Sequence, residues 1–233
     1  MLRPLGGRAS GAGRPEGREE RAARRSDGAT SPARAARRDA EVARLAGIGV
    51  HQVFERLDLD GPVAAGLDVK EEQLEAWLQA EGEPGPARAA ARDARELLDQ
   101  LVAGSLATRL ESLRDHIVAR ELPVLLAAAP DDEAIAFVAG AVDLVYRDPE
   151  SKEWVIVDYK TDVVPADTSL EAHAQAYARQ GGIYRRALRE GLGLAQAPRF
   201  ELWFLASDRC VTLAEPAASA PAQLSLTLPP PRE

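Results

Sequence analysis

The chain has 233 residues and a formal net charge of −8 at pH 7; 45% of its residues are hydrophobic and 28% are charged. This length allows one domain with a sizeable core, and the composition is ordinary for a soluble globular protein. The single cysteine, Cys210, excludes an intrachain disulfide, a four-cysteine zinc site and a four-cysteine iron–sulfur cluster.

The expected location follows from features that the sequence lacks. No apolar run approaches the roughly 18 residues that span a membrane, and the N-terminus has no apolar segment of the kind found in secretory signals. Cysteine usage gives no argument for an oxidising compartment. We therefore expect a cytoplasmic protein that makes no membrane contact.

Charge is unevenly distributed along the chain. Residues 1–40 carry about +5, from ten arginines and five acidic residues, so the rest of a chain of net charge −8 carries about −13. An acidic body disfavours unaided binding of nucleic acid. Residues 1–31 are rich in Gly, Arg, Ser and Ala, and we predict that they are disordered because they can bury little apolar surface. They are either a basic arm that touches nucleic acid or, as we favour, a linker from a longer chain or an incorrectly assigned start.

The first half of the chain is predicted to be helical. Pro32 opens a helical pattern, with Ser31 as its cap. An apolar stripe supports this first helix and consists of Leu45, Ile48, Val53, Phe54 and Leu57. Further helices are expected at residues 68–80 and 86–104, separated by the segment EGEPGP.

Strands are predicted next. The segment HIVARELPVLLA, residues 116–127, predicts a strand that Pro123 breaks. Two β-rich runs follow, at residues 134–146 and 154–157. The turn segment RDPESKE between them predicts a hairpin.

The last part of the chain completes an α/β pattern. Residues 168–190 predict one amphipathic helix that ends near Gly191, and the segments RFELWFL and RCVTLA predict two terminal strands. The tail from Pro216 is rich in Pro and Ala and is expected to be loose. The sequence contains no P-loop, no Gly-x-Ser-x-Gly nucleophile elbow and no His-Glu-x-x-His zinc helix.

The segment EWVIVDYKTD places charged residues directly after a buried strand. Because alternate residues of a strand share a face, Asp158 and Lys160 project together and Tyr159 projects to the other side. The hairpin brings Asp143, which is flanked by apolar residues, alongside Asp158. Two carboxylates on neighbouring apolar strands repel each other unless a lysine, a divalent cation or both lie between them.

Two interpretations of this arrangement remain open. A lone Asp-x-Lys is usually explained by a salt bridge at a strand end. The second carboxylate, Asp143, favours a functional site, because hard oxygen ligands suit Mg²⁺ or Mn²⁺. A lysine beside such a metal can orient a water molecule and stabilise charge on a phosphoryl oxygen, so the arrangement suits phosphodiester hydrolysis.

The stretch GAVDLVYRDPESKEWVIVDYKTD resembles the core of the PD-(D/E)xK nucleases, in particular the RecB-like branch and the C-terminal nuclease domains of AddA- and RecB-type helicases. Other motifs of that branch occur in the same order: Gly47 and His51 in GIGVHQVFERLD, Glu121 in RELPVLL, and Tyr177, Gln180 and Tyr184 in YARQGGIY. The chain departs from the pattern at Gly181 and Gly182, which replace apolar residues and are expected to loosen their helix. The helicase motors and the four cysteines of the iron–sulfur members are missing.

The resemblance implies a fold and a set of roles. The expected fold is an α/β, restriction-endonuclease-like core with a central mixed β-sheet flanked by helices and an N-terminal helical region, over residues 32–215, with a tail at 216–233. The implied ligands of Mg²⁺ or Mn²⁺ are His51, Glu121, Asp143, Asp158 and the backbone carbonyl of Tyr159. Lys160 would orient the attacking water, Gln180 would orient Lys160 or contact the DNA backbone, and Tyr184 would pack beneath Gln180.

Several residues keep a structural alternative. Glu121 is either a distal ligand or a satisfied strand-end carboxylate, and Tyr177 is either functional or a core aromatic. Asp162 is interpreted as a turn residue. The residues interpreted as structural are His116, His173, Trp77, Trp154, Trp203 and, as a buried thiol, Cys210.

The function implied by the resemblance is that of a divalent-metal-dependent DNA nuclease, exonuclease-like, in recombination and repair. The acidic body suggests that a helicase partner, a lost helicase domain or the basic N-terminal arm delivers single-stranded DNA or DNA ends. One alternative is a non-catalytic scaffold of the same fold or a DNA-end-binding module. Another is an ordinary α/β binding module without any dependence on divalent metal.

Overall fold

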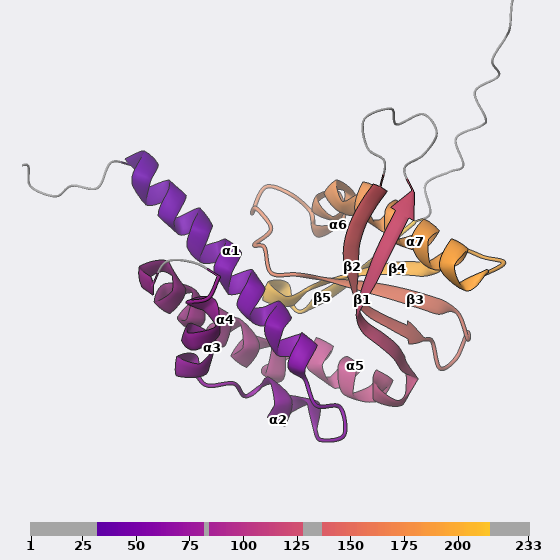
Figure 1. Ribbon diagram of the computed structural model, residues 1–233, viewed down its shortest axis with the longest axis horizontal. Coiled ribbons are helices and arrows are strands. Elements are labelled where there is room, and N and C mark those ends of the chain that lie inside the picture. Colours follow the sequence, from indigo (N-terminus) through magenta and orange to yellow (C-terminus); the bar gives the residue numbers. More distant parts are fainter. Residues whose placement is uncertain (1–31, 82–83, 128–136, 215–233) are drawn as a thin grey trace, which may run out of the picture.

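The structure is a computed structural model that describes residues 32–81, 84–127 and 137–214. A central sheet separates two helical layers (Figure 1). The expectations for residues 1–31, including Ser31 as a cap, and for the tail at 216–233 lie outside the described residues. Among the helices of the described ranges, none has both the length and the apolar character that crossing a bilayer requires.

The sheet is mixed and has the strand order β1-β2-β3-β4-β5. Its strands are β1 Ile117–Ala127, β2 Phe137–Arg147, β3 Trp154–Lys160, β4 Arg199–Phe204 and β5 Arg209–Leu213. Strands β1, β2 and β3 form an antiparallel meander, β4 joins β3 in parallel, and β5 pairs with β4 in antiparallel fashion. The hairpin predicted between β2 and β3 is present, and so are both terminal strands.

Within the described ranges, one group of helices covers one face of the sheet and a second group covers the other (Figure 1). The first group is α1 Pro32–Arg56, α2 Val63–Leu67, α3 Glu71–Leu78, α4 Pro84–Ala103 and α5 Ser105–Leu113. The second group is α6 Leu170–Ala174 and α7 Ala178–Leu192. Val155 and Val157 of β3 pack toward the first group and Ile156 toward the second. Burial on both faces explains the unbroken apolar run WVIV in this central strand.

Two expectations about element boundaries were wrong. Strand β1 is not broken at Pro123, which pairs with Ala141. Because β1 is an edge strand, a residue without an N–H group can be accommodated there. The single helix expected over residues 168–190 is instead α6 and α7 with a 3₁₀ turn between them. Helix α7 continues to Leu192 and ends at Gly193, whose φ of 63° forms a left-handed cap.

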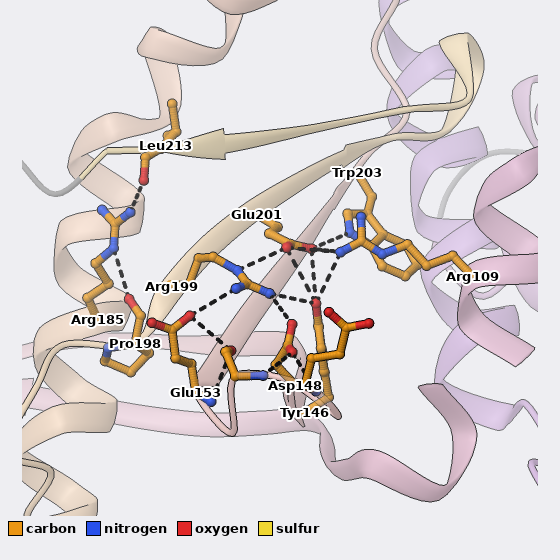
Figure 2. A network of polar contacts seen from close by, with 12 residues as sticks. Arg109, Tyr146, Asp148, Glu153, Arg185, Pro198, Arg199, Glu201, Trp203 and Leu213 are labelled. Carbon is orange, nitrogen blue, oxygen red and sulfur yellow. Dashed lines mark hydrogen bonds and ion pairs between the residues drawn. The ribbon is translucent and has the colours of Figure 1, made fainter. Parts of the chain in front are cut away.

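A buried carboxylate ties the helical layer to the sheet beside the middle of β3, where Glu201 pairs with Val157. Glu201 of β4 accepts hydrogen bonds from Arg109 of α5, from Arg199 and from the indole of Trp203. Arg199 also reaches Asp148 in the β2–β3 turn (Figure 2). A carboxylate buried this deeply requires such partners, so the network fixes how α5 sits on β2 and β4.

Candidate functional site

Three carboxylates lie in one row across neighbouring strands. The antiparallel register of β1 and β2 places Glu121 across from Asp143. Asp143 and Asp158 are next to Leu144 and Val157, the last residues that pair β2 with β3 at this end. Asp143 and Asp158 are only 7% and 3% exposed. The pairing of two buried acids expected from the hairpin is therefore present, and β1 adds a third.

The regular alternation of side chains between the two faces of the sheet is interrupted at this row in both β1 and β2. Ala119 and Leu122 of β1 pack into the same apolar cluster, although a spacing of three puts residues of a regular strand on opposite faces. Glu121 lies between them with a φ of 46°. Val142 and Val145, on either side of Asp143 in β2, share that cluster in the same way. A left-handed glutamate costs on the order of 1–3 kcal/mol, and such strain is commonly retained where it serves a site.

His51 approaches the row from α1. Its Nδ1 atom lies 3.6 Å from an oxygen of Asp143. Ligand atoms of His51, Glu121 and Asp143 all lie within 4.8 Å of one another. Gly47, one turn earlier in α1, explains the close approach: a Cβ atom there would lie 2.9 Å from Oγ1 of Thr161, just after β3. The Gly-x-x-x-His spacing thus brings the helix against the strand end and the imidazole against the carboxylates.

Burial raises the proton affinity of the carboxylates, and at Asp143 and Glu121 the charge of neighbouring carboxylates adds to it. Burial, and then the charge of Asp158, raises the pKa of Asp143 to about 8. Burial also raises the pKa of Asp158, against the opposing effect of Lys160. Burial raises the pKa of Glu121, with smaller contributions from Glu55 and Asp158. The row is therefore short of positive charge.

The donor set fits a divalent cation. Oε1 of Glu121 is buried and has no hydrogen-bond partner among the described residues. Burial lowers the pKa of His51, which keeps the imidazole neutral and able to donate a lone pair. Carboxylate oxygens with one imidazole are ligands that Mg²⁺ and Mn²⁺ accept. A cation among these groups would reduce the repulsion between the carboxylates and would provide a partner for Oε1 of Glu121.

Lys160 borders the row on the α7 side. Its ammonium forms an ion pair with Asp158 and donates a hydrogen bond to Oε1 of Gln180 at 3.1 Å. Nε2 of Gln180 donates to Asp158 at 2.9 Å and to the hydroxyl of Tyr184 at 3.2 Å. The structure thus brings together Asp158, Lys160, Gln180 and Tyr184, four of the residues that the sequence assigned to one site. Lys160 and Asp158 share a face, as expected, and α7 supplies the amide between them.

Tyr159 lies on the opposite face of β3. Its ring is buried and stacks on Phe54 of α1 with centroids 4.2 Å apart. Its backbone N–H donates to Asp143 at 2.6 Å, which fixes the orientation of that carboxylate. The role of the Tyr159 carbonyl as a metal ligand stays a prediction.

Packing explains why a glycine stands at position 181, where the PD-(D/E)xK pattern has an apolar residue. We expected Gly181 and Gly182 to loosen their helix, but α7 is continuous through both. A Cβ atom at Gly181 would lie 2.8 Å from the ring of Phe200. The glycine therefore lets α7 press closely on β4, and this contact carries Gln180 and Tyr184 toward the carboxylates. Gly182 faces open space.

Sequence reasoning missed a second group of contacts beside Lys160. Asp162, interpreted as a turn residue, contacts the imidazole of His173 and accepts a hydrogen bond from Tyr177 at 3.1 Å. The ring of Tyr177 lies 4.0 Å from the ammonium of Lys160. The spacing of four between His173 and Tyr177 was the available signal, because such residues meet on one helical face.

The remaining side chains are structural contacts. Trp203 is buried, Trp154 is half-buried beneath Arg147, and Trp77 lies under Arg56. Cys210 is half-buried rather than fully buried, and burial raises its pKa to about 11, which keeps the thiol protonated.

The comparisons with known proteins agree with this geometry. A search of curated proteins found no match. A family model described as the PD-(D/E)XK nuclease superfamily matches residues 22–226, which is most of the chain. The mixed sheet with helices on both faces, and the row of carboxylates with a lysine at its edge, fit that assignment. The chain therefore belongs to the PD-(D/E)XK nuclease superfamily.

Proposed function

We propose that this protein is a divalent-metal-dependent DNA nuclease that hydrolyses phosphodiester bonds. The observation that carries the proposal is the row formed by the buried Asp143 and Asp158 and the half-buried Glu121, with His51 on one side and Lys160 on the other. A purely structural role gives no reason to bury two carboxylates beside a third with too little positive charge, because each buried charge costs roughly several kcal/mol unless it is compensated.

His51, Glu121, Asp143, Asp158 and the carbonyl of Tyr159 would hold Mg²⁺ or Mn²⁺. When bound, the cation supplies a Lewis acid for the phosphoryl oxygens and lowers the pKa of a bound water. Among these groups, Asp143 is oriented by the Tyr159 N–H, and His51 is neutral through burial. The imidazole of His51 is therefore ready to bind before metal arrives, whereas the carboxyl of Asp143, whose pKa is raised to about 8, is oriented but releases its proton when metal binds.

Lys160 would act on the reacting phosphate itself. Its ammonium is held beside Asp158 by the amide of Gln180, in a position to orient water and to stabilise charge that develops on a phosphoryl oxygen in the transition state. Tyr184 would hold Gln180 through the hydroxyl that accepts its N–H. Each of these contacts limits the motion of a side chain that would otherwise be flexible.

The finer proposal is an exonuclease of the RecB-like branch that works in recombination and repair. Its support is the Asp-Tyr-Lys-Thr-Asp segment at 158–162 and the Tyr-x-x-Gln-x-x-x-Tyr segment at 177–184. Residues after 40 carry about −13 because residues 1–40 carry about +5 of the net −8. Such a body repels DNA, so we propose that a helicase partner, or the basic N-terminal arm, delivers single strands or ends.

The test is cleavage of end-labelled single- and double-stranded DNA in Mg²⁺, in Mn²⁺ and in EDTA. We expect cleavage only with metal, and a loss of at least roughly 100-fold in Lys160→Ala, comparable to removing one transition-state donor. Lys70→Ala is the matched control, because Lys70 is exposed and precedes α3. Cleavage that continues in EDTA, or that Lys160→Ala leaves intact, would refute the proposal.

If neither protein cuts, a Mn²⁺ titration of the wild type and of Asp143→Asn decides between the remaining functions. Metal bound by the wild type and not by the variant would indicate a competent site that awaits its partner. Absence of metal binding would favour the non-catalytic scaffold or DNA-end-binding module.

A further inference from the structure

A polar and aromatic cluster lies against Lys160 on the side away from the carboxylate row. It consists of Asp162, which follows β3, His173 of α6, and Tyr177 in the 3₁₀ turn before α7. Asp162 contacts both His173 and Tyr177 through the same carboxylate oxygen, Oδ2. The Tyr177 ring in turn lies 4.0 Å from the Lys160 ammonium.

We propose that Asp162, His173 and Tyr177 are positioning residues that hold the Tyr177 ring against the Lys160 ammonium and thereby fix that ammonium for the reaction. This inference rests on the nuclease function proposed above. It assigns to Asp162 and His173 a role other than the turn and structural roles expected from the sequence, and it gives Tyr177 the functional one of its two alternatives.

Lys160 needs such support because of its chemistry. A lysine side chain has four rotatable carbons and a compact ammonium that can donate in three directions. Asp158 and Gln180 take two of these directions. The face of an aromatic ring attracts a cation within about 6 Å, and the attraction is stronger where the pair is shielded from water. The Lys160 side chain is only 14% exposed, so its contact with the ring is of the stronger, shielded kind.

The ring is itself held on two sides. Its hydroxyl donates to Asp162, and its edge meets Phe204 of β4 and the imidazole of His173, with centroids 6.3 and 6.0 Å away. Asp162 lies two residues after Lys160 in the same segment. The anchor of the ring therefore moves together with the lysine, so the distance between ring and ammonium is kept constant.

A merely structural cluster would dock α6 onto the sheet without affecting Lys160. The two roles differ in a spectroscopic signature. A ring 4.0 Å from the ammonium shifts the nearby Hε protons of Lys160 upfield, whereas Lys70 and Lys152 are exposed. The chain contains only these three lysines, so selective ¹³C-lysine labelling resolves them.

The experiment compares the Hε signals of the full chain with those of Tyr177→Phe, Tyr177→Leu and Asp162→Ala. Lys160→Ala assigns the shifted signal. We expect the upfield shift in the wild type, its retention in Tyr177→Phe, its loss in Tyr177→Leu and its reduction in Asp162→Ala. Val163→Ala is the control, because Val163 is 81% exposed in the same segment. A shift that survives Tyr177→Leu, or no shift in the folded wild type, would overturn the proposal.

Kinetics under saturating DNA supply a second readout. Tyr177→Leu should lower kcat by roughly 5- to 20-fold with little change in KM, as loss of a cation–ring contact to a catalytic group implies. Tyr177→Phe should retain most of that kcat. Equal losses in kcat and in thermal stability for both variants would indicate a structural role only. Because the lysine shift needs no turnover, an inactive wild type would count against the nuclease proposal without deciding this one.

Discussion

At the scale of single residues, the site is arranged so that the metal-free protein is the strained form. Asp143 has Asp158 and Glu121 as neighbours in its row, and a cationic side chain, Lys160, stands only at the row's edge. The hydrogen bond from the Tyr159 N–H offsets part of this cost. Removing one carboxylate should therefore leave the thermal stability unchanged in EDTA, and should abolish most of the additional stability that metal provides.

Asp143→Asn tests this expectation. In millimolar Mg²⁺, a ligand at 100 times its Kd stabilises the wild type by ~2.7 kcal/mol, which raises Tm by roughly 5–10 °C for a chain of this size. The variant should match or exceed the wild-type Tm in EDTA and gain almost nothing from Mg²⁺. Asp115→Asn, at an exposed carboxylate, should behave as wild type. Thermal melts in EDTA and in Mg²⁺ decide the point, and an undiminished metal gain in Asp143→Asn would contradict it.

At the scale of elements, local patterns predicted what local geometry controls. The hairpin and the shared face of Asp158 and Lys160 followed from strand alternation and turn chemistry. Whether Pro123 breaks a strand depends on β1 being an edge, which is a property of the whole sheet. The left-handed Glu121 and the 3₁₀ turn before α7 reflect packing between layers, which no local pattern reports.

The contact between α1 and the end of β3 yields the prediction at this scale. A methyl group at position 47 would lie 2.9 Å from Oγ1 of Thr161. Gly47→Ala should improve helix propensity by ~1 kcal/mol while displacing α1, and with it His51, from the carboxylates. We expect Mn²⁺ affinity to fall roughly 10-fold, as for loss of support around a ligand, with Tm in EDTA changed little.

The double variant Gly47→Ala/Thr161→Ala provides the control. Removing the hydroxyl of Thr161 makes room for the new methyl group, so metal affinity should recover toward that of Thr161→Ala alone. Isothermal titration with Mn²⁺ measures all four proteins. A loss in Gly47→Ala that Thr161→Ala does not relieve would show that the helix is displaced by some other contact.

At the scale of the whole molecule, the two ends of β3 have different tasks. The end at Lys160 carries the strained, charge-poor row. The part of β3 from Trp154 to Val157 lies beside the Glu201 network, in which each acidic group has an arginine partner, Arg109 or Arg199 (Figure 2). Arg109 brings α5 to that network, and Arg199 joins it to the β2–β3 turn. The helical layer that carries His51 is thus tied to the sheet by a network that contains none of the proposed metal ligands.

The pH dependence of stability tests whether the ion pair between Asp148 and Arg199 stabilises this part of the molecule. The hydrogen bond from Arg199, together with N–H groups of the turn, holds the pKa of Asp148 well below its ordinary value. A carboxylate with a depressed folded-state pKa stabilises the protein above its unfolded pKa of about 3.9, and the contribution is lost as pH falls further.

Asp148→Asn should therefore lower the free energy of unfolding near pH 6 by ~1–2 kcal/mol, the range for a charge-assisted hydrogen bond after partial exposure is allowed for. The stability gap between variant and wild type should be constant above about pH 5 and should narrow steadily as the pH falls from about 4 to about 2, as measured by urea unfolding in EDTA. Glu150→Gln, in the same turn but exposed, should show no such difference. A gap between Asp148→Asn and wild type that is as large at pH 2 as at pH 6 would mean that packing, rather than the ion pair, holds the turn against β4.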